Sequence, residues 1–252
     1  MRAPLTSITL PGRHQREAAS ELRAIHNPKA KSSRPSNPLR VVCISDTDNA
    51  RPILPPGDLL IHARDLTENG SFDEPHTCKV IIAGNHDVLL DEAFLPKYPE
   101  RRYGQTKTKA DLDWGSVIYL EDNCVTLDFP QAESIGDVSP SSQPRRLTIF
   151  GRCFYLAEEI AQILPHLVVF GHIHVSYGRE DVVLDGVQRA YEVMTGWAGW
   201  MTVGWMAILV LLAKLKGLVL PNRDQEGTVF VNASVVSGSR NTLTNEPIVV
   251  EF

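Results

Sequence analysis

Three side chains capable of metal binding or acid–base chemistry follow one apolar run of the sequence. The run is Val80–Ala83, and the side chains are those of Asn85, His86 and Asp87. A short block rich in Val and Ile favours a buried strand, and Gly84 permits a sharp exit from it. A stiff strand with reactive side chains at its carboxyl end is typical of an active-site loop.

Two earlier apolar runs also end in carboxylates. Leu39–Ile44 is followed by Asp46 and Asp48, and Leu59–Ala63 is followed by Asp65. In an extended chain Asp46 and Asp48 point the same way. Two like charges on one side cost free energy unless a cation or hydrogen-bond donors neutralise them. A turn held by Asx hydrogen bonds is the alternative for this pair.

A fourth apolar run, Leu167–Phe170, leads into two histidines. His172 and His174 are two positions apart, so they face the same side of an extended chain, and imidazole is a common metal ligand. His62 differs because it lies within the run Leu59–Ala63, where we expect a hydrogen-bonded core histidine.

The elements that must position these residues suggest an α/β fold. Short apolar runs without alternation are typical of parallel strands covered on both faces. Val117–Leu120 and Cys124–Leu127 are predicted to form a hairpin. Further strands are predicted at Leu147–Phe150, Thr228–Val236 and Ile248–Phe252, and helical spacing is present at Gln15–Ile25 and Leu156–Leu164.

Composition narrows the class of protein. The chain has 252 residues, a net charge of −5 and no basic stripe, so we expect no nucleic-acid partner. Its four cysteines form no CxxC pair, which argues against a zinc knuckle. We expect no secretory signal, reduced thiols and a cytoplasmic location. One domain is predicted over residues 39–252, preceded by a poorly ordered extension over residues 1–38.

Val193–Ala213 is uncharged and long enough to span a membrane. Lys214 and Lys216 follow it, as a positive flank would, but the segment also contains three glycines and two threonines. The alternative is a buried or surface-packed helix with its tryptophans on a contact face. We expect this alternative, and no membrane partner.

Taken together, the motifs SDTD, RDLT, GNHD and GHIH, at residues 45–48, 64–67, 84–87 and 171–174, resemble the calcineurin-like metallophosphoesterases. The tail VNASVVSG resembles the subgroup of metallophosphoesterase-domain proteins related to the brain 239 protein, which has many fungal members. The resemblance covers residues 39–252. It implies a two-sheet β-sandwich flanked by helices, and a hydrolase that cleaves phosphoric monoesters or diesters. It also implies two divalent metal ions (Mn, Fe or Zn) that activate a hydroxide.

The resemblance assigns a role to each motif residue. His86 would protonate the leaving group, and Asp87 would orient His86. The resemblance implies Asp46 and His174 as ligands of the first ion. Asp65 would bridge the two ions. Asn85 and His172 would bind the second ion. Asp48 stands where the family has His, and a carboxylate there can still bind metal.

Departures from the family pattern, the carboxylate of Asp48 among them, leave a second function open. Arg64 stands where the family has Gly, and its charge can pair with Asp65 or bind a substrate phosphate. No histidine-containing turn follows Phe154, so the second ion lacks a ligand. No crossover helix follows Glu74. The last two have the form of internal deletions, either in the protein or in the gene model. The alternative to a hydrolase is therefore a degenerate, non-catalytic binding module. The sequence predicts neither the substrate nor the oligomeric state.

Overall fold

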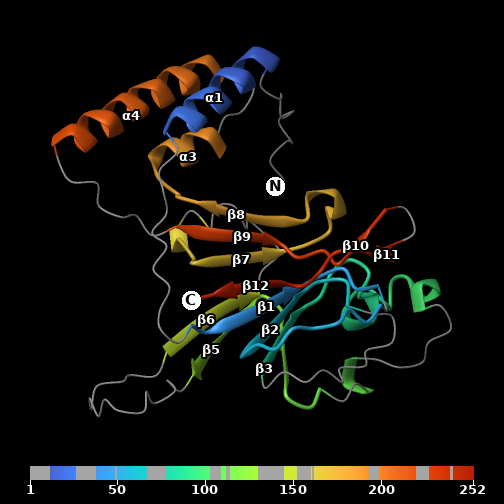
Figure 1. The fold of residues 1–252 in the computed structure, drawn as a ribbon. Helices are drawn as coiled ribbons and strands as arrows, with labels where there is room; N and C mark the ends of the chain where they lie inside the picture. The colour runs from blue at the N-terminus through green and yellow to red at the C-terminus, as the bar shows by residue number, and fades with distance from the viewer. Residues whose placement is uncertain are drawn as a thin grey trace, which may run out of the picture. The chain divides into compact units, whose positions relative to one another are not determined.

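The structure is a computed structural model that describes residues 12–26, 38–48, 50–66, 78–102, 109–111, 114–129, 145–151, 160, 162–192, 199–219, 227–238 and 241–252 (Figure 1). The expected features after Glu74 and Phe154 lie outside these residues, as does most of the helical pattern Leu156–Leu164. The chain folds as a mixed α/β protein with several sheets, as its strand pattern predicted.

The largest sheet has five strands. Their order is β12 (Ile248–Glu251), β1 (Arg40–Ile44), β2 (Leu59–Ala63), β3 (Cys78–Ile82) and β4 (Val117–Leu120). β1, β2, β3 and β4 run parallel, whereas β12 is antiparallel to β1. Every residue of β2 is buried, as expected for a central parallel strand whose sequence is apolar throughout. The parallel arrangement predicted for the first three strands is confirmed.

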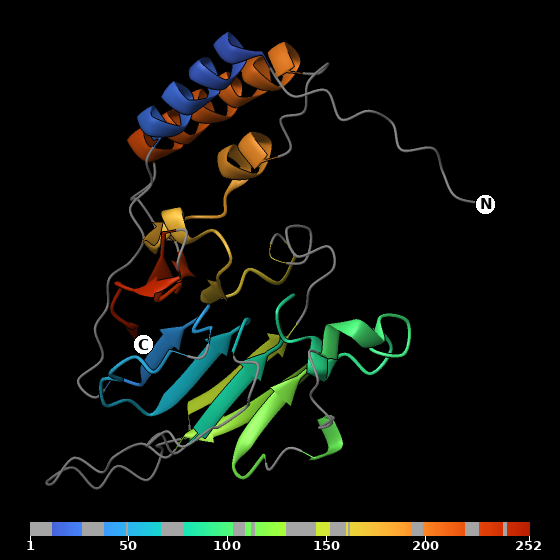
Figure 2. The same cartoon turned by 90° about the vertical axis from the view of Figure 1, so that its right-hand side faces the viewer.

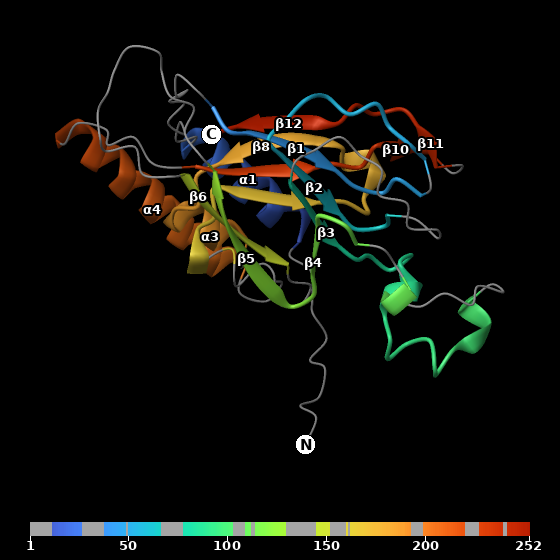
Figure 3. The same cartoon turned by 90° about the horizontal axis from the view of Figure 1, so that it is seen from below.

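The predicted hairpin of Val117–Leu120 with Cys124–Leu127 is wrong. β4 pairs with β3, and the antiparallel partner of β5 (Asn123–Phe129) is β6 (Arg145–Gly151) (Figure 3). Cross-strand bonds specific to β5 and β6 support this pairing. The hydroxyls of Thr126 and Thr148 are 3.0 Å apart, and Arg146 donates to Asp128 at 3.0 Å. The apolar pattern located each strand but carried no information about its partner.

A second sheet has the order β7 (Leu167–Phe170), β9 (Thr228–Asn232) and β8 (Gly178–Val182). The segment after β9 also reaches the end of β1. Ser45 N–H donates to Ala233 O at 2.8 Å, Val235 N–H donates to Ser45 O at 3.0 Å, and Ala233 N–H donates to Phe170 O at 2.9 Å. These bonds hold the carboxyl ends of β1 and β7 next to one segment. A short ribbon of β10 (Val236–Ser237) with β11 (Thr242–Leu243) follows.

Three α-helices pack together around a small core of their own. They are α1 (Arg13–His26), α3 (Gly186–Glu192) and α4 (Gly199–Val219). In Figures 1 and 2, α1 (blue) and α4 (orange) lie side by side. The core shared by the three helices consists of Ala19, Val187, Ala190, Met206 and Val210. α1 agrees with the helical pattern expected at Gln15–Ile25.

Asp185 stabilises the start of α3. Its Oδ1 accepts the backbone N–H groups of Val187 at 2.9 Å and Gln188 at 3.0 Å, which is an N-cap interaction. Its other oxygen forms a short contact with His26 Nε2 at the end of α1. This one carboxylate therefore both caps α3 and ties it to α1.

α4 is the one described helix whose length and apolar composition are sufficient to cross a membrane. Its inner side packs against α1 and α3, and its outer side exposes large apolar residues. These are Trp200, Met201, Trp205, Ile208, Leu211, Leu212 and Leu215. An apolar helix with an exposed face of this kind is unusual in a monomeric soluble protein.

The chain divides into two compact units. One comprises Met1–Ser32, Ala157–His166 and Asp181–Val229, and it contains the three α-helices. The other comprises Ser33–Leu156, Leu167–Glu180 and Phe230–Phe252, and it contains all the predicted site residues. The 3₁₀ helices among the described residues of the second unit are Val88–Leu90, Pro99–Arg102, Lys109–Asp111 and His174–Ser176. The domain boundary expected after residue 38 stays a prediction.

Candidate functional site

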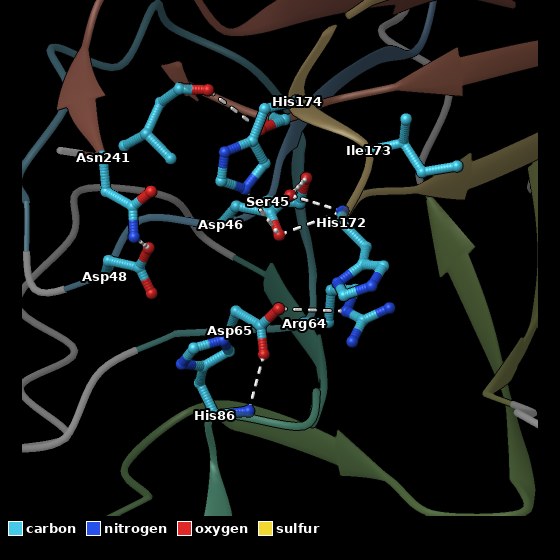
Figure 4. Close-up of polar contacts among 12 residues, drawn as sticks. Ser45, Asp46, Asp48, Arg64, Asp65, His86, His172, Ile173, His174 and Asn241 are labelled. Atoms are coloured by element: carbon cyan, nitrogen blue, oxygen red, sulfur yellow. Dashed lines mark hydrogen bonds and ion pairs between the residues drawn. The ribbon is translucent and has the colours of Figure 1, made fainter. Parts of the chain in front are cut away.

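The loops that leave β1, β2 and β3 are joined to one another by backbone hydrogen bonds. Asp46 N–H donates to Arg64 O at 3.1 Å, and Arg64 N–H donates to Ile82 O at 2.8 Å. β7 ends beside the same loops, because His172, the second residue after β7, donates its backbone N–H to the Asp46 carboxylate. The parallel topology therefore gathers the polar residues at one edge of the second unit (Figure 4).

Asp46 is the most deeply buried carboxylate of this cluster, with 1% of its surface exposed. Its Oδ2 accepts Ser45 Oγ–H at 2.7 Å, and His172 N–H reaches both of its oxygens, at 3.0 and 2.9 Å. His174 Nε2 lies 3.7 Å from its Oδ1. Three elements thus converge on one carboxylate, which is held in a fixed orientation.

Asp65 is the second buried carboxylate, with 3% of its surface exposed. Its Oδ1 accepts the backbone N–H of His86 at 2.9 Å, which fixes the start of the loop after β3. Its Oδ2 accepts Arg64 Nε–H at 3.1 Å. The terminal guanidinium nitrogen of Arg64 also donates to Asn85 Oδ1 in a short contact. Arg64 therefore binds oxygens that the family resemblance assigns to metal.

Asp48 is half-buried, and its Oδ2 accepts Asn241 Nδ2–H at 2.6 Å. Burial raises the pKa of its carboxyl above the ordinary value of 3.8. The charge of His86 opposes this rise, the carboxylates of Asp65 and Asp46 add to it, and His174 opposes it. Asp48 therefore shares one electrostatic environment with four other predicted site residues. Its partner Asn241 was not predicted, because a turn residue so far along the chain carries no sequence signal for this contact.

Asp87 is buried and joins two loops. Its Oδ1 accepts Leu66 N–H at 2.9 Å, and its Oδ2 accepts Gly84 N–H at 2.7 Å. This places the loop after β2 against the loop after β3. The predicted orientation of His86 by Asp87 stays a prediction, and the bonds described here give Asp87 a loop-positioning function.

Two glycines allow the strand ends to approach these carboxylates. A Cβ atom on Gly84 would lie 2.2 Å from Asp65 Oδ1, and a Cβ atom on Gly171 would lie 2.2 Å from Asp46 Oδ2. Both distances are far below any van der Waals contact. Gly84 and Gly171 are therefore required here because no larger side chain fits.

His62 is buried within β2. Its Nε2 lies 3.0 Å from Thr47 Oγ1, and Thr47 Oγ1 donates its own proton to Leu66 O at 2.6 Å. The hydroxyl proton is thereby used, so His62 Nε2 carries the hydrogen of this bond, and Nδ1 has no hydrogen-bond partner. Burial lowers the pKa of His62 to about 4, against a smaller opposing effect of Asp46. His62 is the core histidine that the sequence predicted.

The donor types at this edge of the sheet suit a divalent metal, but the structure does not gather them around one point. Carboxylate, amide and imidazole groups bind Mn²⁺, Fe²⁺ and Zn²⁺. Among the described residues, however, no group of three or more His, Cys, Asp or Glu side chains is close enough to hold one ion. Asp65 and Asn85 are instead engaged by Arg64. The residues present do not fit the two-metal centre that the family resemblance implies.

Comparison with known proteins supports the family suggested by the motifs. No protein-family model matches the chain. The chain is 27% identical to the human metallophosphoesterase domain-containing protein 1 over 61% of its own length. It is also 28% identical over 56% of its length to the UPF0046 protein K07C11.7 of Caenorhabditis elegans.

A third relative carries a different name. The probable rhamnogalacturonate lyase C of Emericella nidulans is 32% identical over 86% of this chain, but the match spans 24% of that protein. The chain spans 65% of the length of the human and nematode relatives. These distant similarities support a relationship between this chain and the metallophosphoesterase-domain proteins.

Proposed function

We propose that this chain binds phosphoric esters and hydrolyses them with the help of a divalent metal ion. The observation that carries the proposal is the convergence of Asp46, Asp65, His86 and His174 at the carboxyl ends of parallel strands. Buried carboxylates beside imidazoles are the groups needed for phosphoryl chemistry. The metallophosphoesterase-domain relatives support the same reaction class.

The chain's own residues can act on a phosphoryl group directly. Arg64 offers a planar set of N–H donors that matches phosphate oxygens. His86 is exposed, and the hydrogen bond from its backbone N–H to Asp65 fixes the loop that carries it. Its imidazole is therefore placed to donate a proton to a leaving oxygen.

The test is hydrolysis of a chromogenic phosphodiester, bis(p-nitrophenyl) phosphate, by the purified chain. Turnover is expected with added Mn²⁺ and should stop when a chelator is added. His86→Ala and Asp65→Asn should each remove at least nine-tenths of the rate. Asp128→Asn, on the exposed β5–β6 hairpin, is the matched control and should retain it. No turnover with Mn²⁺, Zn²⁺ or Fe²⁺ would overturn the proposal.

A non-catalytic binding module is the second candidate, and the contact of Arg64 with Asp65 and Asn85 favours it. Such a module would bind inorganic phosphate or a nucleoside monophosphate without cleaving esters. Calorimetry with these ligands separates the two functions. Binding without turnover supports the module, and Arg64→Gln should then weaken binding at least tenfold.

The lyase name of the Emericella nidulans relative does not lead to a second proposal of activity. The match covers about a quarter of that protein, whereas matches to proteins named for metallophosphoesterase domains cover nearly two thirds of theirs. A cytoplasmic location and the absence of nucleic-acid partners also remain proposals. Cell fractionation and a nucleic-acid retention assay test them.

A further inference from the structure

Arg64 occupies a backbone position that favours glycine. Its φ angle is +75°, in the left-handed region that side chains other than glycine rarely adopt. Hydrogen bonds on both sides hold it there, from Arg64 N–H to Ile82 O at 2.8 Å and from Asp46 N–H to Arg64 O at 3.1 Å. The backbone of Arg64 is therefore held between the end of β3 and the loop after β1, and this fixes where its side chain begins.

The guanidinium turns back onto the site from this point. It contacts Asp65 Oδ2 through Nε at 3.1 Å and Asn85 Oδ1 through a terminal nitrogen. Asp65 is almost fully buried, and 28% of the Arg64 side chain is exposed. A buried carboxylate requires a nearby positive charge or several donors, and Arg64 supplies the positive charge together with one donor, its Nε–H.

We propose that the Arg64 guanidinium takes the place of the second metal ion, so that this chain binds one divalent ion fewer than a two-metal phosphoesterase. This inference rests on the proposed function, since it concerns the same site. Protein oxygens bind such ions at about 2.0–2.2 Å, using the lone pairs that face the metal. The guanidinium engages one oxygen each of Asp65 and Asn85, so an ion that used these two oxygens as ligands would have to displace it.

The replacement keeps part of the metal's function. A guanidinium has five N–H donors, and the bonds to Asp65 and Asn85 use only some of them. The remaining donors can hold the oxygens of a tetrahedral phosphoryl group, in the manner of arginines in other phosphate sites. The charge is +1 instead of +2, so the polarisation of a bound ester is weaker than a second metal would give.

A simpler account of the same contacts is that Arg64 only ties the two loops together. The two accounts differ in what happens when the side chain is removed. If Arg64 blocks an ion, Arg64→Gly exposes Asp65 Oδ2 and Asn85 Oδ1, and metal stoichiometry rises. If Arg64 is only a tie, metal stoichiometry stays the same. Glycine suits the left-handed backbone, so this variant is expected to fold.

The experiment titrates the chelator-stripped full chain with Mn²⁺ by calorimetry and records the electron paramagnetic resonance spectrum. The Arg64→Gly chain should bind one more Mn²⁺ than the natural chain and show a spin-coupled pair that the natural chain lacks. Arg64→Gln, which removes the charge and keeps side-chain bulk, should also gain the ion. Arg146→Gly, which removes an exposed arginine on β6, is the matched control and should gain none.

Equal stoichiometry in the natural and Arg64→Gly chains, or two Mn²⁺ ions in the natural chain, would overturn the inference. The second outcome needs no variant, so the inference can be tested even if a substitution prevents folding. The titration uses no substrate. A chain that gains an ion in Arg64→Gly but hydrolyses no ester would overturn the proposed function and leave this inference standing.

Discussion

Five residues of the site adopt left-handed backbone conformations. The φ angles are 53° for Asp46, 43° for Asp48, 75° for Arg64, 52° for Asp65 and 79° for His172. Each such residue costs on the order of 1 kcal/mol relative to an ordinary conformation. Clustered strain of this kind persists only where surrounding contacts enforce it, and it is concentrated at functional sites.

Because Gly171 lies so close to Asp46, we predict that a larger residue at position 171 destabilises the fold. Gly171→Ala would place a methyl group 2.2 Å from Asp46 Oδ2, and Gly84→Ala would do the same at Asp65 Oδ1. Each variant should lose roughly 1–3 kcal/mol of unfolding free energy through overpacking, and should lose any hydrolytic activity. Urea unfolding measures the first effect and the phosphodiester assay the second.

Gly204→Ala in α4 is the control for those variants. A Cβ atom at Gly204 meets nothing within 4 Å, and alanine is favoured over glycine inside a helix. We therefore expect a gain of about 0.5–1 kcal/mol. If Gly171→Ala were as stable as this control, the close packing of β7 on Asp46 would be contradicted.

We predict that burial of His62 makes the unfolding free energy depend on pH. Its pKa is lowered from 6.5 to about 4 by burial, so between these values the unfolded chain binds a proton that the folded chain does not. The unfolding free energy therefore rises with pH from 4 to 6.5 and this contribution is complete above 6.5, with a total of roughly 3 kcal/mol. Urea unfolding of the natural chain and of His62→Gln at pH 4.5, 5.5, 6.5 and 7.5 should show a smaller acid loss in the variant. Parallel pH profiles would show that His62 is not the titrating group.

At the scale of elements, strand sequences determined where β1, β2 and β3 form but not all of the pairing. Their blocks of Val, Ile and Leu predicted buried parallel strands, and the structure confirms them. β4 and β5 were wrongly joined as a hairpin because a short turn between two apolar runs is equally compatible with separation into two sheets. Sequence periodicity reports one strand's environment, whereas pairing depends on the whole sheet.

In the candidate site, too, the local sequence predicted some features, whereas others depend on the fold as a whole. Residue types and strand ends predicted the carboxylates and imidazoles that the fold brings together. The hydrogen bond from Asn241 to Asp48 and the close approach of Gly171 depend on loop conformations that no local pattern encodes. The sequence identified Arg64 as a departure and left its effect open between pairing with Asp65 and binding phosphate. The structure places it on Asp65 and Asn85.

The packing of α4 on α1 gives a prediction at this scale. Met206 is fully buried in the helical core with Ala19 and Val210, so Met206→Ala leaves a cavity. The expected loss is about 2–5 kcal/mol of unfolding free energy. Met201, on the same helix, is 83% exposed, and Met201→Ala should change the free energy by no more than about 0.5 kcal/mol. Equal effects of the two substitutions would contradict the assigned inner face.

At the scale of the whole molecule, α4 decides how the chain relates to a membrane. Its length and composition permit a span. Its inner side, however, packs along α1, which carries the exposed charges of Arg13, Arg16, Glu17 and Glu21. A spanning α4 would either draw these charges into hydrocarbon or separate α4 from α1 and lose the core around Met206. Both alternatives cost more than a few kcal/mol.

We therefore predict that α4 does not span a bilayer. After cell fractionation the chain should be in the soluble fraction, or should be released from membranes by alkaline carbonate. Leu211→Asp, at a position 58% exposed on the outer face, should leave folding unchanged, whereas Val210→Asp, on the buried face, should unfold the helical core. Retention in the carbonate-washed membrane pellet, reduced by Leu211→Asp, would instead show that the outer face lies in lipid. The packing of α4 on α1 would then belong to a different state of the protein.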